Sequence, residues 1–550
     1  MASLRSLPWD SLEKYSGTLG LRNLGILLVT GFIFIKVIEL AHSLHYHSRR
    51  ARELGCRHPQ RIRPNRLPLG VDSVIRMMKA DNHHQVPEEL HKIYLEQGNA
   101  IKEGVVNTWK ESKFGVSHYV TVEPRNIQAI LATQFNDFEV GRRRFNVSTP
   151  LLGKGIFILD GKGWETARTL LRPQFARSLV SDLDLEERHV QSLFNQLSMP
   201  GSDGWTKVAD IKPLFFNLTL DTATEFLFGE SLHSQLQTSS TDLNKSPVRH
   251  GYDLRCVAEA IDTGLHDMAV RIRLGELYWL YNPKSWRESI RLCHGFTDTY
   301  IQLLLDKGQE ANNSEGGGER GTKYVFLNEL AKSTQDAMQL RSQTLAVLMA
   351  GRDTTASLLC WIFWMLARHP AVLKRLRQCV HESFGACSEP NITFESLKSC
   401  KYLQYVINET NRTCTILPFN VRVAAKDTSL PLGGGPDGTY PLYIKKGAEV
   451  QFWPSITHTR EDIWGPDAKE FNPDRWEGRK PGFEFLPFLA GPRICLGQQL
   501  ALTEAAYVVV RFLQRFDQIE STDKSWERFH HLTVTDAPME LPLRFHDAGM

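Results

Sequence analysis

The sequence predicts a mostly α-helical protein with small β-sheets, an α+β fold, preceded by one membrane-spanning helix. Three observations predict it: an apolar run near the N-terminus, one long helical pattern that is apolar on nearly every side, and only a few short segments that alternate like strands. The chain has 550 residues, 42% hydrophobic and 23% charged, so it can bury a large core. Its net charge of only +3 argues against a nucleic-acid partner.

The first element is the apolar run at 24–41, which predicts a membrane anchor within residues 1–47. At about 18 residues it is just long enough to cross a hydrocarbon core of ~30 Å. A cleaved secretory signal is the alternative, but the run is long and no convincing small-residue cleavage site follows it. Basic residues stay on the cytosolic side of a span, so the rest of the chain is expected in the cytosol. The basic residues lie C-terminal to the run: Arg49, Arg50, Arg52, Arg57, Arg61, Arg63 and Arg66.

Residues 48–70 are predicted to form a basic connector, rich in proline, between the anchor and the globular domain at 71–550. Proline cannot continue a helix, and the stretch CRHPQRIRPNRLPLG holds three prolines, so a stiff spacer is expected. Its arginines are also suited to contact anionic lipid headgroups.

Within the domain, short strands are expected at 117–123 and in two pieces of 440–452 around a Lys446-Gly447 turn. Residues 308–321, GQEANNSEGGGERG, are expected to form a flexible surface loop. The nine cysteines are irregularly spaced and include no Cys-x-x-Cys pair. This pattern argues against a zinc knuckle or a thioredoxin-like motif and indicates a reduced chain that faces the cytosol.

One helix is predicted to run through the centre of the domain. Ser333 or Thr334 can cap its start and Pro370 stops it, which gives about 35 residues and a length of ~50 Å. Its second half, 357–366, is apolar on nearly every side, as a helix in the middle of a large protein must be.

The polar stretch AGRDTT at 350–355 interrupts this central helix. Its glycine alone weakens a helix by about 1 kcal/mol. The alternative to a functional role is a kink in which a hydroxyl bonds back to the previous turn. Polar groups in a buried helix usually have a task, so a functional role for Asp353 and Thr354 is favoured.

The strongest chemical signal is the segment FLAGPRICLG at 488–497. A thiolate that binds haem iron needs a sharply turning loop with amide groups aimed at the sulfur, which predicts Cys495 as the iron ligand. Small neighbours let the macrocycle come close, and Gly491 and Gly497 are such neighbours. Arg493 offers a cation for a haem propionate. The N-terminal end of the helix that follows favours the negative sulfur.

With Phe488, this segment resembles the haem-ligand signature of the cytochrome P-450 superfamily, Phe-x-x-Gly-x-Arg-x-Cys-x-Gly, at every fixed position. The alternative is a buried structural cysteine in a glycine-containing loop, which does not account for so many matching positions. The resemblance implies a haem-thiolate monooxygenase that holds haem b and inserts one oxygen atom of O2 into a substrate C–H bond. It also implies electrons from NADPH through a flavoprotein, the NADPH–cytochrome reductase, and a place in the endoplasmic reticulum membrane.

Other parts of the chain resemble the same superfamily in the same order. Glu409 and Arg412 match its Glu-x-x-Arg element, in which an acid and a base share one helix face. Arg475, in FNPDRW, matches the arginine that joins this pair. The resemblance implies that these three residues have a structural role and lock the core around the ligand loop.

The resemblance also assigns haem-binding and catalytic roles. Trp164 and Arg168, one helical turn apart, and Arg422 match residues that donate to haem propionates in the family. Asp353 and Thr354 match the acid–alcohol pair of the family's central helix, which assists the activation of dioxygen and delivers protons. The thiolate is expected to push electron density from the opposite side of the haem.

A finer resemblance is to the fungal fatty-acid and alkane hydroxylase branch, which oxidises terminal carbons of long aliphatic chains. It rests on GCRHPQ…PLGVD after the anchor, YVFLNELAKSTQD before the central helix, and AGRDTTA within it. The sequence departs from this branch around Arg412. Asn411 and Thr413 replace the usual leucines, and Cys414-Thr415 replace an aromatic residue and a proline.

The expected function is therefore hydroxylation of a long-chain apolar substrate, a fatty acid or an alkane. A tailoring oxidase of fungal secondary metabolism, acting on a polyketide or terpenoid, is the alternative within enzymes. A haem-containing lipid-binding or sensing protein without turnover is the alternative outside them. The acid–alcohol pair argues against the last, because a passive binder needs no proton relay.

The substrate pocket is expected between 145–157, the helices of 213–285, the central helix and 416–421. The reductase is expected on the face nearest the ligand cysteine, where Arg172 and Arg177 are candidate contacts. Reductases present acidic surfaces, so salt is expected to weaken this attraction.

Overall fold

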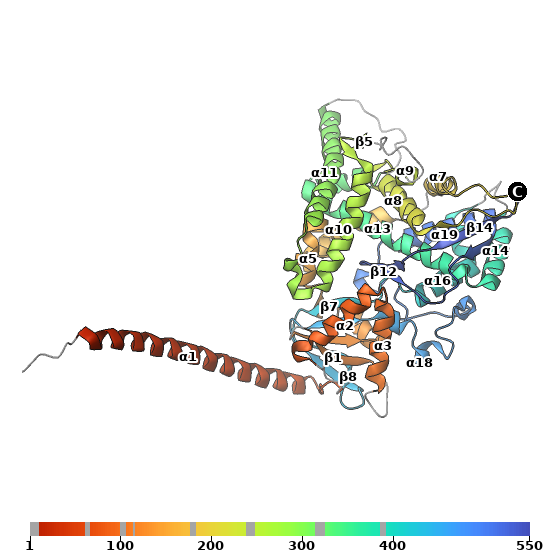
Figure 1. Ribbon diagram of the computed structural model, residues 1–550. Coiled ribbons are helices and arrows are strands. Elements are labelled where there is room, and N and C mark those ends of the chain that lie inside the picture. The colour runs from red at the N-terminus through yellow and green to blue at the C-terminus, as the bar shows by residue number, and fades with distance from the viewer. Residues whose placement is uncertain are drawn as a thin grey trace, which may run out of the picture.

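One long helix projects from a body in which helices form most of the bulk and a small sheet lies near the base of that helix (Figure 1). This computed structural model describes residues 10–549 except 61–66, 100–105, 114–115, 177–182, 238–247, 314–324 and 386–391. The longer helices are α1 (Asp10–Glu53), α2 (Val71–Asn82), α3 (Val86–Asn99), α5 (Arg142–Leu152), α6 (Gly161–Leu171), α7 (Leu183–Phe194), α8 (Lys212–Phe228), α10 (Leu254–Arg273), α11 (Lys284–Asn313), α12 (Phe326–Ser333), α13 (Ala337–Leu366), α14 (Pro370–Phe384), α16 (Lys401–Thr413) and α19 (Gln498–Arg515). The shorter ones are α4 (Pro124–Gln128), α9 (Ser234–Gln237), α15 (Phe394–Ser399), α17 (Pro454–Thr457) and α18 (Glu461–Trp464). The mostly helical fold class is confirmed.

The largest sheet has the strand order β1 (Thr108–Lys113), β2 (Val116–Thr121), β10 (Glu449–Phe452), β7 (Asn420–Ala424) and β3 (Phe138–Glu139). Among its described strands, only β2 and β10 pair in parallel. The smaller sheets are β11 (Phe516–Ser521) with β14 (Pro542–Asp547) and β4 (Ala209–Asp210), β12 (His530–Leu532) with β13 (Asp536–Pro538), β5 (Val248–Arg249) with β6 (Tyr252–Asp253), and β8 (Thr428–Gly434) with β9 (Tyr440–Ile444). The strand expected at 117–123 is β2, and the two pieces expected within 440–452 are β9 and β10.

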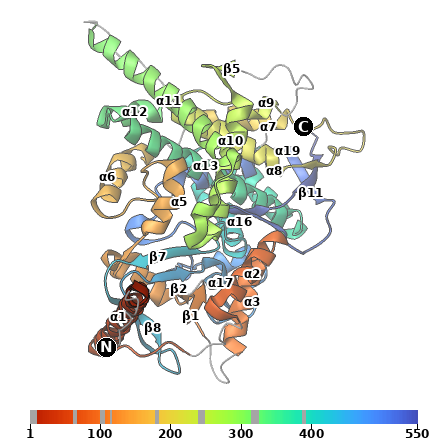
Figure 2. The ribbon, with the colours of Figure 1, turned by 60° about the vertical axis from the view of Figure 1, so that its left-hand side comes forward.

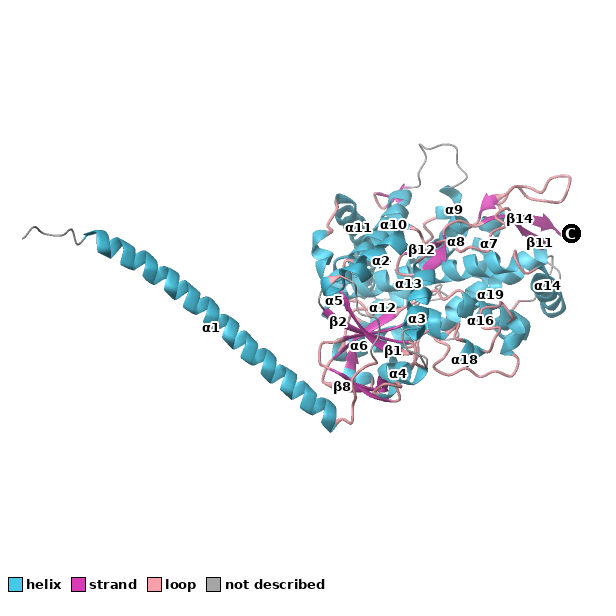
Figure 3. Cartoon of the chain, turned by 60° about the horizontal axis from the view of Figure 1, so that its bottom comes forward, coloured by secondary structure: helices cyan, strands magenta, loops and turns pink. Residues whose placement is uncertain are grey.

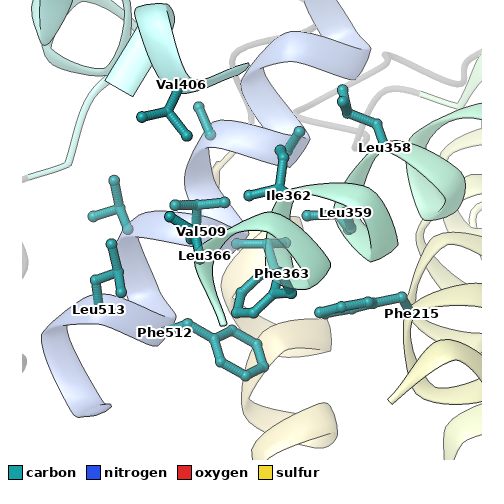
Figure 4. Packing of buried hydrophobic residues seen from close by; sticks show 14 of the residues in the cluster. Phe215, Leu358, Leu359, Ile362, Phe363, Leu366, Val406, Val509, Phe512 and Leu513 are labelled. Carbon is teal, nitrogen blue, oxygen red and sulfur yellow. The ribbon is translucent and has the colours of Figure 1, made fainter. Parts of the chain in front are cut away.

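The core of the body forms around the apolar second half of α13. Phe363 of this helix lies with its ring centroid 5.0 Å from Phe215 of α8 and 4.7 Å from Phe512 of α19 (Figure 4). Val406 of α16 and Val509 of α19 belong to the same buried cluster. Contacts among aromatic rings at these distances stabilise a core beyond their buried area alone. The elements that carry the predicted site residues are thereby fixed to one another.

The central helix starts and ends at other residues than the sequence predicted. It begins at Ala337, because the carboxylate of Asp336 caps it by accepting two backbone N–H groups. Ser333 instead ends α12, and Thr334 is the C-cap of that helix. The central helix has 30 residues rather than about 35, since Pro370 begins α14 instead of ending α13 directly.

The N-terminal helix α1 has 44 residues and is therefore longer than the predicted span of 24–41. Within the described part of the chain, two helices are long and apolar enough to cross a membrane, 23–53 and 337–366. In the first, none of the most apolar window is buried, whereas 78% of that window is buried in the second. The second is thus the core helix α13, and α1 is the candidate membrane helix (Figure 3).

The segment predicted as a stiff spacer packs, in its described part, against the domain. The first proline after the anchor is Pro59, so nothing breaks the helix at 48–53, and α1 runs on to Glu53. Arg57 and Pro59 then form β-bridges with the β8–β9 hairpin, and the guanidinium of Arg57 lies 3.6 Å from the ring centroid of Tyr440. Residues 61–66 lie outside the described part of the chain. The loop expected at 308–321 also begins later, because α11 continues to Asn313, and 314–321 is not described.

A buried histidine ties the C-terminal hairpin to the N-terminal part of the domain. His530 of β12 contacts the carboxylates of Asp536 in β13, at 2.8 Å, and of Glu88 in α3, at 2.9 Å. Burial disfavours the charge of this histidine, but the two carboxylates outweigh burial and raise the pKa of His530 to about 9. His530 is therefore a charged link at neutral pH.

Candidate active site

The ligand loop turns sharply around Cys495, between η7 (Gly491–Arg493) and α19. The backbone N–H of Cys495 donates to the carbonyl of Phe488 at 3.0 Å. Leu489 and Gly491 both have positive φ values, +59° and +68°. A non-glycine residue in this conformation stores about 1 kcal/mol of strain or more, which is common in loops that serve a site.

The two glycines of the loop differ in what the protein requires of them. A Cβ added at Gly491 would lie 1.9 Å from the carbonyl oxygen of Leu131, so only glycine fits there. A Cβ at Gly497 would meet Phe175 at an ordinary 3.6 Å. The protein itself thus has room at Gly497, and its predicted role, close approach of the macrocycle, stays a prediction.

The thiol of Cys495 combines accessible surface with a desolvating environment. The residue is exposed, yet burial among protein atoms raises the pKa of the thiol, while the backbone N–H of Gly497 and the charge of Arg168 lower it. A thiol with one open side and protein atoms around the rest is suited to a flat ligand that would cover the open side. Arg168 donates to the carbonyl of Ile494 at 3.0 Å and so contacts the ligand loop directly.

Arg493 is held by the start of α6. Its guanidinium donates to the carbonyl of Leu159 and to Asp160 Oδ1, at 2.9 and 2.8 Å, and stacks 4.5 Å from the ring centroid of Trp164. Asp160 also accepts the backbone N–H groups of Val140 and Gly141. One carboxylate thus positions Arg493 and also holds the backbone just before α5. Asp160 was not predicted from the sequence.

Three arginines gather near the carboxylate of Asp160, which pairs with one of them: Arg144, Arg422 and Arg493. The first two share Asn420, whose Oδ1 accepts from Arg144 at 2.8 Å and from Arg422 at 3.0 Å. Burial, and then the charge of Arg493, lowers the pKa of Arg144 to about 10. Burial also lowers the pKa of Arg422, which the positive charges of Arg144 and Arg493 lower further and Asp160 raises.

Crowded, buried guanidinium groups need an anion, and carboxylates suit them best. The two propionates of haem would supply that charge, so this set of residues fits haem b, with Cys495 at the iron and Arg422 and Arg493 at the propionates. Arg144 belongs to the same set but lies within GRRRF, a run that reads as surface charge in the sequence. The donor roles predicted for Trp164 and Arg168 remain predictions, since these side chains contact Arg493 and Ile494.

On the central helix, Asp353 is buried and Thr354 is half-buried. The hydroxyl of Thr354 donates to the carbonyl of Ala350 at 2.8 Å within an unbroken helix. Burial raises the pKa of Asp353 to about 6, although the neighbouring Arg352 opposes this shift. An acid with this pKa can hold or release a proton near neutral pH.

A second buried acid, Glu504 of α19, was not found from the sequence. Burial raises its pKa to about 8, and a hydrogen bond with Thr355 of the central helix opposes this shift. Its Oε1 has no hydrogen-bond partner among the residues that the structure describes. The available signal was an acid inside the apolar run ALTEAAYVVV, which reads as an ordinary helix residue.

The structure brings Glu409, Arg412 and Arg475 together in one buried network. Arg412 donates to both carboxylate oxygens of Glu409 at 2.8 and 2.7 Å, and Arg475 Nε donates to Oε1 at 3.2 Å. The carboxylate also accepts from the backbone N–H of Asn472 and the indole of Trp476, each at 2.9 Å. Arg412 donates further to three backbone carbonyls that precede η6 (Pro473–Trp476).

One of the residues that depart from the branch pattern after Arg412, Thr415, contacts a buried histidine. Thr415 Oγ lies 3.0 Å from Nδ1 of the buried His458, whose Nε2 accepts the backbone N–H of Leu486 at 2.8 Å. Burial lowers the pKa of His458 to about 3, so the ring is neutral and Nδ1 carries its proton. Thr415, which replaces the usual proline, thus accepts a hydrogen bond from His458. His458 in turn holds the backbone of Leu486, just before the ligand loop.

Comparison with known proteins identifies the family. The family model for Cytochrome P450 matches residues 82–542. A cytochrome P450 monooxygenase of a Fusarium species, g430, is 45% identical over 92% of this chain and 88% of its own length. Another, alt2 of Alternaria solani, is 42% identical over 89% and 91%. Cytochrome P450 52A9 of Candida maltosa is 46% identical over 82% and 85%.

These findings confirm the resemblance on which the sequence interpretation rested, including the likeness to the fungal alkane and fatty-acid hydroxylase branch. Members of the family are oxidoreductases that incorporate one oxygen atom, use haem b and receive electrons from NADPH through a reductase. The family model covers the ligand loop, the three arginines and the Glu409 network, which all lie within residues 82–542. The chain therefore belongs to the cytochrome P450 family of monooxygenases.

Proposed function

We propose that this monooxygenase hydroxylates a long-chain apolar substrate, a fatty acid or an alkane. The observation that carries the proposal is the match to cytochrome P450 52A proteins over most of the chain, together with the branch-like AGRDTTA in the central helix. The residues at 416–421, apart from Asn420, remain apolar despite the departure after Arg412. Leu417, Phe419 and Val421 among them are half-buried, as the side chains of an apolar pocket wall would be.

Each part of the site has a proposed task. Cys495 would hold the haem iron, and Arg144, Arg422 and Arg493 would fix the haem through its propionates. When bound, the haem supplies the redox chemistry and the transfer of oxygen. Asp353 would hold a proton at its carboxyl and exchange it near neutral pH, and Thr354, the next residue of the helix, would offer its hydroxyl to the oxygen-binding side of the haem. Glu409 and its partners would keep the ligand loop in place.

A second candidate is a tailoring oxidase that acts on a polyketide or terpenoid. Two observations favour it. One is the Thr413–Thr415 departure from the branch pattern. The other is that the monooxygenases of Fusarium and Alternaria are 45% and 42% identical over about nine tenths of the chain, whereas cytochrome P450 52A3-B of Candida maltosa is 38% identical over a similar share. It differs from the first candidate in the shape of the substrate and not in the chemistry.

Purified full-length protein with reductase and NADPH separates the two. Straight-chain fatty acids and alkanes of increasing length would be compared with a panel of polycyclic polyketides and terpenoids of similar apolar area. The expected result is a substrate-induced shift of the haem spectrum, and a hydroxylated product by mass spectrometry, that peak at one chain length. Product from the polycyclic panel alone would refute the fatty-acid and alkane proposal.

We also propose that α1 anchors the protein in the endoplasmic reticulum membrane with the domain in the cytosol. Ile272, Trp279 and Leu280 are exposed at the turn between α10 and α11 and suit contact with lipid. Arg271, which stacks between Tyr278 and Trp286, holds this turn. Full-length protein is expected to stay with membranes after alkaline carbonate extraction, and release into the supernatant would contradict the anchor.

The reductase is proposed to dock on the face nearest Cys495. Arg172 is exposed, and its charge acts on Arg168, which contacts the ligand loop, whereas Arg177 lies outside the described residues. An Arg172→Glu variant is expected to raise the KM for reductase and flatten its salt dependence. A KM equal to that of the wild type at low salt would remove Arg172 from the docking surface.

A further inference from the structure

A buried arginine links the acid of the central helix to an acid on a different helix. Arg352 of α13 has a side chain that is only 3% exposed. One of its nitrogens, Nη1, lies 3.1 Å from Asp353 Oδ1 and 2.5 Å from Asp262 Oδ1. Asp262 belongs to α10, and its side chain is 59% exposed. Two carboxylates, one buried and one in contact with water, therefore share a single guanidinium nitrogen.

This contact joins two helices that make little direct contact with each other. α10 packs along α11 and against α5, and α13 packs on the same two helices but mainly on α8 (Figure 2). The guanidinium of Arg352 is held in place by Phe216 of α8, whose ring centroid is 5.3 Å away. The Asp262–Arg352 ion pair is thus a polar connection from α10 to the middle of the central helix.

The charges around Asp353 set the direction of the effect. Its largest influence is burial, which favours the protonated acid; Arg352 opposes burial, and the negative charge of Asp262 adds to it. Asp262 acts in two ways, since it repels a second carboxylate and draws Arg352 away from it. Two further titratable groups, Lys212 of α8 and His531 of β12, lie near Asp262. Burial and the charge of Lys212 lower the pKa of His531 to about 4, which leaves it neutral.

We propose that Asp262, through the shared Arg352, controls whether Asp353 holds a proton, and that the position of α10 thereby governs the acid of the central helix. With α10 in the observed position, Asp262 neutralises part of Arg352 and Asp353 favours its protonated form. When α10 moves away, Arg352 pairs with Asp353 alone, and the acid loses its proton to water. Asp262 and Arg352 are positioning residues, and the inference rests on the proposed role of Asp353 as a proton donor.

The test measures the protonation of Asp353 in the resting, haem-loaded full-length enzyme without substrate. Infrared difference spectra would follow the C=O band of a protonated carboxyl against pH, and the band is assigned by its loss in Asp353→Asn. Wild type is expected to lose the band with a midpoint near pH 6. In Asp262→Asn the midpoint is expected to fall by about one pH unit, because one like charge is removed and Arg352 is left to Asp353.

Glu259→Gln is the matched control. Glu259 is an exposed acid on the same helix, so the variant makes the same change in charge and is expected to keep the wild-type midpoint. A midpoint in Asp262→Asn equal to that of wild type, or one that falls equally in Glu259→Gln, would overturn the proposal. Asp262 is largely exposed, so its replacement by asparagine is not expected to disturb folding.

A second readout connects the shift to turnover. In Asp262→Asn the pH profile of product formed per NADPH consumed is expected to move to lower pH by the same amount as the infrared midpoint. An unshifted profile beside a shifted midpoint would remove the functional part of the proposal. Failure to hydroxylate fatty acids or alkanes would refute the proposed substrate but would leave the infrared result, and with it the link from Asp262 to Asp353, intact.

Discussion

The buried network around Glu409 allows a prediction with a worked magnitude. Replacing Glu409 by glutamine keeps the shape of the side chain but removes its charge and one acceptor oxygen. Arg412 then lies fully buried without its counter-ion, and the new NH2 group faces N–H donors that the lost oxygen accepted. Breaking one partner of a buried ion pair costs about 3–5 kcal/mol. Glu409→Gln is expected to lower the free energy of unfolding by that amount.

Equilibrium urea unfolding of the full-length protein in detergent, followed by tryptophan fluorescence, measures this cost. The matched control is Glu461→Gln, in which the same substitution removes an ion pair with Lys469 whose side chains are 57% and 60% exposed. Exposed pairs contribute below about 1 kcal/mol, so the control should unfold close to wild type. Equal midpoints for Glu409→Gln and Glu461→Gln would refute the assignment of Glu409 and its partners as the lock of the core.

Three other predictions follow from the charges and the ligand loop. Arg144→Gln is expected to speed the transfer of haem to an apoprotein acceptor by about tenfold, because one charge-assisted hydrogen bond is lost. The control is Arg142→Gln, at an exposed arginine, which is expected to match wild type. Equal transfer rates for the two variants would exclude Arg144 from the haem site. His530→Gln is expected to cost roughly 3 kcal/mol of stability below pH 6, because the raised pKa stabilises the folded form while the ring is charged, and the difference should vanish as the pH rises through 9. A cost in His530→Gln that does not change with pH in urea unfolding would contradict this. Gly491→Ala is expected to abolish haem incorporation in the expressed protein, whereas Gly497→Ala is expected to fold. Soluble Gly491→Ala with a normal haem content would refute the close contact between Gly491 and the carbonyl of Leu131.

The parts of the fold that the sequence predicted well have strong local signals. The apolar second half of the central helix and the alternating segments of β2, β9 and β10 are patterns that burial on one or all faces imposes directly. Helix ends are weaker signals, since Thr334 and Asp336 are both good caps and tertiary context selects between them. The anchor was predicted as a span of apolar residues, but the helix extends beyond it because Glu53 and the residues before it also favour a helix.

The site was predictable where spacing carries the chemistry and unpredictable where only the fold does. The ligand loop and the Glu409–Arg412 pair are local in sequence. Arg144 and Asp262 look like ordinary charged residues in the sequence. The partner of Arg144, Asn420, is 276 residues away, and the partner of Asp262, Arg352, lies on a different helix. Asp160 could not be found for the same reason, because its partner Arg493 lies 333 residues later in the sequence.

The most direct test of Cys495 as the iron ligand is the carbon monoxide difference spectrum of the reduced, expressed protein, with Cys495→Ser beside wild type. Cys256→Ser, at another exposed cysteine, is the matched control. Wild type and the control are expected to show a Soret band at the red-shifted position of a thiolate ligand, and Cys495→Ser is expected to show no such band. A histidine-like band in well-folded wild type, or an unchanged thiolate band in Cys495→Ser, would contradict the assignment of Cys495 as the iron ligand.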